Sequence, residues 1–199
     1  MHWNTHYASE SMDNNVQVID LNNIEENLDV QVSEPMSFDE MLSYYMKQNN
    51  VSYEEALKAF PNRAKRMAGA PVSYRTLKVG LTVTSSYHPH LEFYCETSEY
   101  GNYWGILSIY STQLVRRDSN TGASKQFGGS IDVWLRSPYQ IEYVVNGDFY
   151  NNGTTTVSGG VGMNIKVNES ATINCQASIA TSSNFYKYFY EHRTAQYQW

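Results

Sequence analysis

The chain has 199 residues, of which 41% are hydrophobic and 17% charged, so it has enough apolar material for one domain with its own core. It contains no run of about 18 to 20 apolar residues, and we therefore expect no transmembrane segment. The formal net charge of −6 is unevenly placed: nine of the 20 acidic residues precede Lys47, the first basic residue. The remaining body is only weakly basic, which argues against a nucleic-acid-binding surface.

Residues 1–35 form an acidic leader that we predict to be flexible, because charged segments without a periodic apolar face lack a core to pack on. A signal peptide is not expected, since residues 1–15 contain no apolar run. Two alternatives stay open. The apolar run at 16–21 suits a short strand or a partner-binding segment, and the acidic leader could instead fold back on the mildly basic body.

Residues 36–70 are predicted to form a pair of short helices. Ser37 with Glu40 and Ser52 with Glu55 have the spacing of capping boxes, which satisfy the unpaired amides of a first helical turn. Apolar residues then recur at helical spacing on one face: Phe38, Met41, Leu42, Tyr45 and Met46.

Residues 71–199 are predicted to form a mainly β domain, an antiparallel β sandwich of about eight strands with a barrel-like closure as the alternative. Apolar residues alternate with polar ones from position 77 onward, which is typical of half-buried strands. Turn-forming sequences separate the strands, and no helical pattern lies between them. One strand is expected over 154–167, with the glycines at 159–162 marking a bulge or a twist.

Cys95 and Cys175 each fall on the apolar face of a predicted strand. We therefore expect both to point into the core and to form a disulfide, which would place the protein in an oxidising compartment. Two buried thiols that act as small hydrophobic residues are the alternative.

The strongest candidate for metal chemistry is the set His88, His90 and Glu92. On an extended chain these side chains alternate onto one face, and two imidazoles with a carboxylate are common zinc ligands. Polar side chains that face the solvent are the simpler interpretation, so we predict no cofactor and assign no catalytic residue. Enzymatic activity is left undecided and is not favoured.

Aromatic side chains indicate a different class of function. Exposed rings with a polar tip provide stacking surface for glycans or proteins. Two groups of candidate binding residues lie near predicted strand ends or on one strand face: Tyr100, Tyr103 and Trp104, and Tyr186, Tyr188 and Tyr190. Ordinary cross-strand packing is the alternative interpretation of these rings.

These observations favour a non-catalytic binding module, with a metal-dependent enzyme at His88, His90 and Glu92 as the alternative. A pore-forming or inhibitor protein comes third, because residues 157–180 alternate like a hairpin with a lipid face and a wet face. Segments 37–41 and 51–56 resemble parts near the mature ends of exported proteins of Gram-positive bacteria. The resemblance contains no catalytic motif and implies secretion or display at the cell surface.

Overall fold

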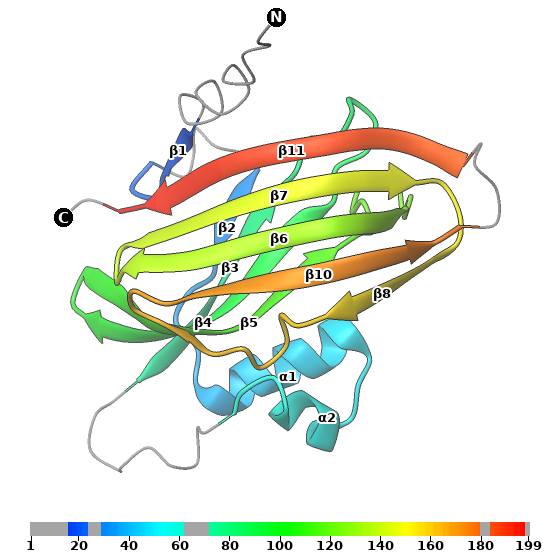
Figure 1. The fold of residues 1–199 in the computed structure, drawn as a ribbon. Coiled ribbons are helices and arrows are strands. Elements are labelled where there is room, and N and C mark those ends of the chain that lie inside the picture. Colours follow the sequence, from blue (N-terminus) through cyan, green and yellow to red (C-terminus); the bar gives the residue numbers. More distant parts are fainter. Residues whose placement is uncertain (1–15, 24–28, 62–71, 180–183, 198–199) are drawn as a thin grey trace, which may run out of the picture.

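The computed structural model describes residues 16–23, 29–61, 72–179 and 184–197. Its strands form two separate sheets that pack face to face, which confirms the predicted β sandwich and not the barrel (Figure 1). The six-stranded sheet has the order β1 (Gln17–Asp20), β11 (Phe185–Gln196), β7 (Gln140–Tyr150), β6 (Gln126–Ser137), β10 (Ser170–Ser178) and β8 (Thr154–Ser158). The five-stranded sheet has the order β2 (Val30–Val32), β3 (Ser73–Gly80), β4 (His90–Tyr100), β5 (Tyr103–Val115) and β9 (Ile165–Lys166).

The main core lies between the two sheets. Alternate residues of each strand point inward, so that Leu77 and Val79 of β3 meet Ile131 and Val133 of β6 in one buried cluster. Among the described residues, the strand pairs are antiparallel except β1 with β11, which is parallel.

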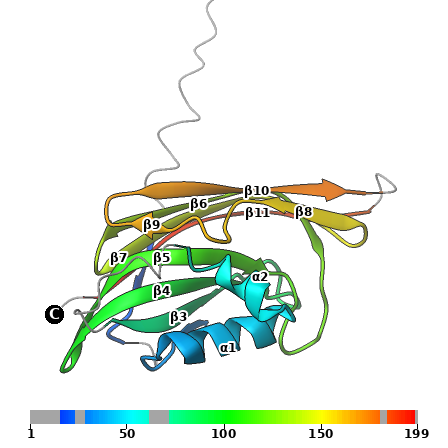
Figure 2. The same ribbon diagram turned by 90° about the horizontal axis from the view of Figure 1, so that it is seen from below.

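A second core lies on the outer face of the five-stranded sheet, beneath α1 (Phe38–Asn49) and α2 (Tyr53–Leu57) (Figure 2). Both serine caps are present, since Ser37 and Ser52 each accept a hydrogen bond from the backbone amide three residues later, and the full capping box with its reciprocal bond forms at Ser37 and Glu40. The apolar stripe of α1 packs on tyrosines of the sheet. The buried members of this second cluster are Phe38, Met41, Leu42, Tyr45, Ala56, Ala59, Phe60, Tyr74, Tyr94 and Tyr110.

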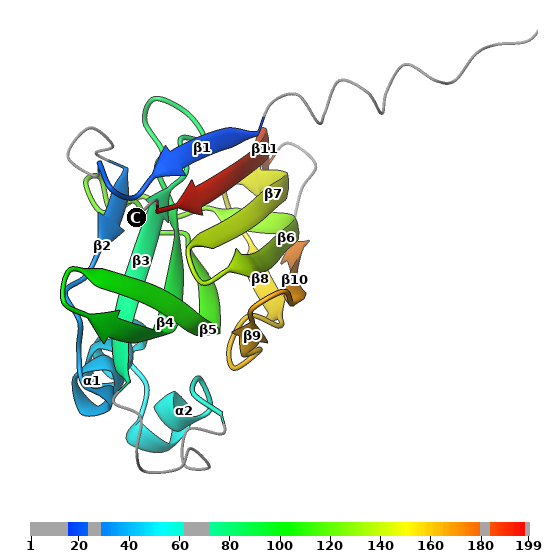
Figure 3. The same ribbon diagram turned by 90° about the vertical axis from the view of Figure 1, so that its left-hand side faces the viewer.

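Within the predicted leader, residues 1–35, the structure confirms the alternative of a short strand in the run at 16–21. Strand β1 pairs with β11 at one edge, and β2 pairs with β3 at an edge of the other sheet (Figure 3). Ile19 is 1% exposed and belongs to the main core, so apolar burial holds this segment despite its charge. Residues 1–15 and 24–28 lie outside the described part of the chain.

The strand predicted over 154–167 is divided between the two sheets. Strand β8 pairs with β10, whereas β9 pairs with β5 on the opposite side of the core. Gly159, Gly160 and Gly162 lie between them with φ of 91°, 93° and 71°, values that other residues rarely adopt. A Cβ on Gly160 would stand 2.5 Å from the carbonyl oxygen of Thr112. The glycines therefore allow a crossing, and the continuous hairpin predicted over 157–180 does not form.

Candidate functional site

Two hairpins at one end of the sandwich enclose a small groove, which we call the hairpin groove. The β4–β5 hairpin comes from the five-stranded sheet and the β6–β7 hairpin from the other. The groove has a volume of about 280 Å³ and is lined by Ser98, Tyr100, Tyr103, Trp104, Gly105, Leu107, Pro138 and Tyr139. Its residues are thus brought together by the packing of two sheets.

The rings of the hairpin groove are exposed to different degrees. Tyr100, Tyr103 and Tyr139 are 83%, 55% and 42% exposed. Trp104 is half-buried, and its ring lies 4.2 Å from that of Tyr197, centroid to centroid. The surface of the groove therefore presents three tyrosine rings beside the Trp104 indole, which packs on Tyr197.

Arg75 fixes the indole further. Its guanidinium carbon lies 4.4 Å from the centroid of the Trp104 ring, and it makes hydrogen bonds of 2.6–3.2 Å to the carboxylate of Glu99. A guanidinium over an indole face is an attractive cation–π contact. Because this cation is already paired, it adds little net charge near the groove.

Gly105 keeps the two hairpins close. A Cβ at this position would stand 3.2 Å from Cβ of Pro138 and 3.4 Å from the ring of Tyr139. Next to it, the amide of Ile106 donates a 2.7 Å hydrogen bond to the carbonyl of Pro138. The groove is thus built on ordered backbone, which lowers the entropy lost when a ligand binds.

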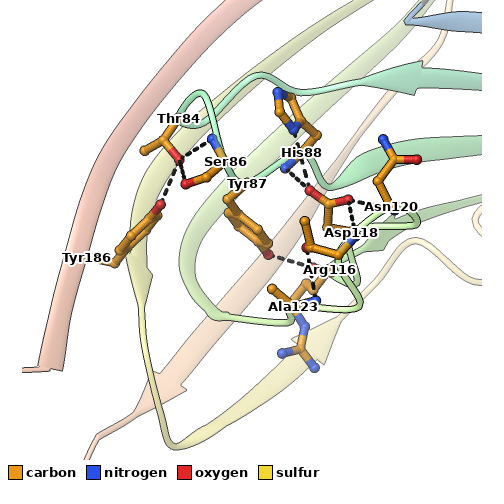
Figure 4. A network of polar contacts seen from close by, with 10 residues as sticks. Thr84, Ser86, Tyr87, His88, Arg116, Asp118, Asn120, Ala123 and Tyr186 are labelled. Atoms are coloured by element: carbon orange, nitrogen blue, oxygen red, sulfur yellow. Dashed lines mark hydrogen bonds and ion pairs between the residues drawn. The ribbon is translucent and has the colours of Figure 1, made fainter.

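The second predicted group of tyrosines lies elsewhere and does not share one face. A bulge between Phe185 and Lys187 shifts the register of β11, so Tyr186 packs against the core, where its ring meets Tyr87 at 6.0 Å. Its hydroxyl lies 2.6 Å from that of Thr84 (Figure 4). Tyr188 and Tyr190 remain exposed, and the hydroxyl of Tyr188 donates to Asn146. The prediction of one face was wrong because a bulge cannot be read from alternation.

A larger hollow, of about 490 Å³, lies where the edge of the five-stranded sheet meets the loop after β5, and we call it the polar cleft. Its polar members are Asp29, Gln31, Lys78, Thr82, His88, His90, Ser119 and Asn120. Gly80 pairs with His90 in the sheet and lies on the same lining; a Cβ at this position would stand 3.0 Å from Cβ of Asp29, so the glycine leaves room for Asp29.

The structure does not gather His88, His90 and Glu92 into a metal triad. His88 Nδ1 lies 3.4 Å from Asp118 Oδ2, whereas His90 Nε2 lies 3.8 Å from Glu92 Oε2. Among the described residues, no three His, Cys, Asp or Glu side chains are arranged to hold a metal ion. Each imidazole instead has its own carboxylate, so the metal-dependent alternative is not carried further.

Asp118 organises the loops beside the polar cleft. Its carboxylate accepts 2.8 Å hydrogen bonds from the amides of His88 and Asn120, and it also accepts from Thr121 (Figure 4). Burial would raise the pKa of Asp118, but these amides and the His88 ring lower it below its ordinary value. The carboxylate therefore stays charged and ties the segment before β4 to the loop after β5.

Glu92 is a second buried carboxylate, 1% exposed, between α1 and the polar cleft. Tyr44 of α1 donates a 2.7 Å hydrogen bond to it. Burial acts to raise the pKa of Glu92, but the neighbouring His90, the Tyr44 hydroxyl and the Lys78 charge lower it overall. This side chain is therefore ionised behind the His90 ring.

The structure does not contain the predicted disulfide. Cys95 and Cys175 are both free thiols. The inward direction of both side chains is confirmed, because both are buried in the main core. Cys95 lies beside Ile109 on β5, and Cys175 beside Gly129 on β6. Burial raises the pKa of both thiols, so they act as small apolar side chains.

Sequence reasoning missed Tyr139 in the hairpin groove and Lys78, Asp118 and Asn120 around the polar cleft. Tyr139 follows Pro138 in a turn, which marks an exposed ring at a strand end. Asp118 begins a turn-forming sequence, and its side chain caps that turn. Their approach to the other residues depends on the packing of separate strands.

Comparisons of the chain with protein-family models, with curated proteins and with solved structures found no match. In the part of the chain that the structure describes, no helix is sufficiently long and apolar to cross a membrane.

Proposed function

We propose that the protein is a binding module whose hairpin groove takes a neutral sugar ring of a glycan. The observation that carries this proposal is the grouping of three exposed tyrosine rings, Tyr100, Tyr103 and Tyr139, around a groove with Trp104 in its lining. Aromatic rings offer a flat apolar face, and tyrosine adds a hydroxyl at the rim. A sugar ring has the matching combination of apolar C–H faces and hydroxyl groups.

The chemistry of the lining favours a neutral ligand. None of the residues around the hairpin groove, all from the described part of the chain, carries a charge at neutral pH. Binding sites for charged groups use arginine, lysine or carboxylate partners, because a buried unpaired charge is costly. A volume of about 280 Å³ is at the lower end for ligand sites, so it suits a single ring or the end of a chain.

A protein ligand is the other binding class. Protein interfaces bury about 800 Å² on each partner, which exceeds the surface of this small groove. The proposal therefore commits to a glycan. The prediction of secretion loses the disulfide on which it rested and stays a prediction.

The test is a glycan array with the labelled protein, followed by calorimetry with the best soluble oligosaccharide. We expect Tyr100→Ala and Tyr103→Ala each to weaken binding about tenfold, which corresponds to about 1.4 kcal/mol of lost stacking. Trp104 gives a second readout, because a sugar that binds in the groove should change its fluorescence. A Trp104→Phe variant should remove this signal.

Two exposed tyrosines provide matched controls. Tyr53 on α2 is 55% exposed, as Tyr103 is, and Tyr188 on β11 is 51% exposed. Tyr53→Ala and Tyr188→Ala should bind the same oligosaccharide as tightly as the wild type. The proposal fails if no neutral glycan binds, or if the control variants lose as much affinity as the groove variants.

A further inference from the structure

The polar cleft differs from the hairpin groove in its chemistry. Three of its lining residues, Lys78, His88 and His90, carry or can take up a positive charge. Ser119 and Asn120 add a hydroxyl and an amide from the loop after β5. With about 490 Å³, the cleft has the size of ordinary small-ligand sites.

Two carboxylates next to the polar cleft lie behind its imidazoles and do not line it. Glu92 and Asp118 are each 1% exposed. Asp118 is saturated by backbone amides, and Glu92 is bound by Tyr44. They balance the charge of the protonated imidazoles, so that Lys78 provides the remaining positive charge of the lining. The pairs leave Nε2 of His88 and Nδ1 of His90 as further donors.

Asp29 is the acidic residue that lines the cleft itself, and it has a cationic partner. Its Oδ2 lies 2.9 Å from Nη1 of Arg193, whose side chain is 10% exposed. The same Nη1 also lies 3.2 Å from Oε1 of Glu191, so Arg193 is shared by two carboxylates. Its charge reduces the negative charge that Asp29 brings to the cleft. Lys78 Nζ has no carboxylate oxygen within 4 Å among the described residues.

We propose that the polar cleft binds a tetrahedral oxyanion, a sulfate or phosphate ester group, through Lys78, His88 and His90. All three residues line the cleft, and charged donors make charge-assisted hydrogen bonds to such a group, which are about twice as strong as neutral ones. The hydroxyl of Ser119 and the amide of Asn120 provide neutral donors at the same site. This site is independent of the neutral groove at the hairpin end.

Histidine side chains in general gain a proton between about pH 8 and pH 5, so binding at this site should strengthen as the pH falls. The other charged groups that face these rings are Lys78 on β3, Glu92 on β4, Asp118, and the Asp29–Arg193 pair. Glu191, whose pKa is raised by burial, also takes up a proton on acidification. It contacts Arg193 and Tyr143 and does not line the cleft, so variants of the histidines separate the two effects.

The test uses sulfate, which keeps its two charges between about pH 5.5 and pH 8 while histidine titrates. The full chain is titrated with sulfate at both pH values by calorimetry, and the imidazole signals are followed by NMR. We expect sulfate to bind roughly tenfold more tightly at the lower pH than at the higher one. At the lower pH, Lys78→Gln and His90→Gln should each weaken sulfate binding by roughly the same factor of ten. Glucose 6-sulfate and glucose 6-phosphate then distinguish the two ester sources.

His192 provides the matched control, because it also pairs with a carboxylate, Glu142, at 2.8 Å but on the outer face of the other sheet. His192→Gln should bind sulfate as the wild type does. The proposal is overturned if sulfate does not bind at the lower pH, if affinity is the same at both pH values, or if His192→Gln loses as much as His90→Gln. Circular dichroism shows whether each variant is folded. If His90→Gln does not fold, Lys78→Gln tests the site in its place.

Discussion

Strand β1 allows a direct test of whether the N-terminal segment belongs to the folded domain. Ile19 and Val18 are neighbours on this strand, but Ile19 is 1% exposed and Val18 is 59% exposed. Ile19 packs in the main core beside Ala195 of β11, its neighbour in the parallel register. We expect Ile19→Ala to lower the free energy of unfolding by about 2–5 kcal/mol, since it removes buried methyl groups and leaves a cavity. Val18→Ala should change it by less than about 0.5 kcal/mol.

The measurement is equilibrium unfolding in urea, followed by circular dichroism, together with a thermal melt. For a domain of this size each kcal/mol shifts the melting temperature by about 2–4 °C, so Ile19→Ala should melt about 4–20 °C lower. The slope of the urea transition should not change, because both variants expose the same surface on unfolding. Equal stability of the two variants would refute the argument and show that β1 is not part of the cooperative unit.

Three further outcomes follow from the helices, a buried carboxylate and the thiols. Met41→Ala, in the second core, should lower the free energy of unfolding by about 2–5 kcal/mol, whereas Tyr53→Ala on the exposed face of α2 should be near neutral in the same urea titration. The pKa of Glu92 in the folded protein lies below its ordinary value of 4.5, so the Glu92 carboxylate stabilises the fold above pH 4.5 and loses this effect as the pH falls through the lowered pKa. The difference in unfolding free energy between wild type and Glu92→Gln should therefore shrink below about pH 4.5. A difference that stays constant with pH would contradict this. Cys95 and Cys175 should react with a thiol reagent only after the protein is unfolded in urea. If neither sulfur reacts in unfolded protein without added reducing agent, the two cysteines form a disulfide.

The candidate sites show why residue patterns identify some contacts and not others. Tyr100, Tyr103 and Trp104 are close in sequence, and a hairpin keeps them together, so their grouping was predictable. Tyr139 joins them from another sheet, which no local pattern indicates. The same holds for His88, because its carboxylate partner is Asp118, 30 residues away, and not Glu92.

The local sequence pattern determined most of the secondary-structure elements of this protein. Alternating apolar residues specified most of the strands and the inward direction of both cysteines, and capping serines specified where the two helices begin. Tertiary structure decided what these elements meet. Strand β1 is short and ends in an acidic residue, so the burial of Ile19 against the sandwich has to offset the conformational entropy lost when this segment becomes ordered. The packing of the two sheets also decides the bulge before Lys187, the crossing at Gly160 and the free state of both thiols. Residue periodicity along one strand contains none of this information.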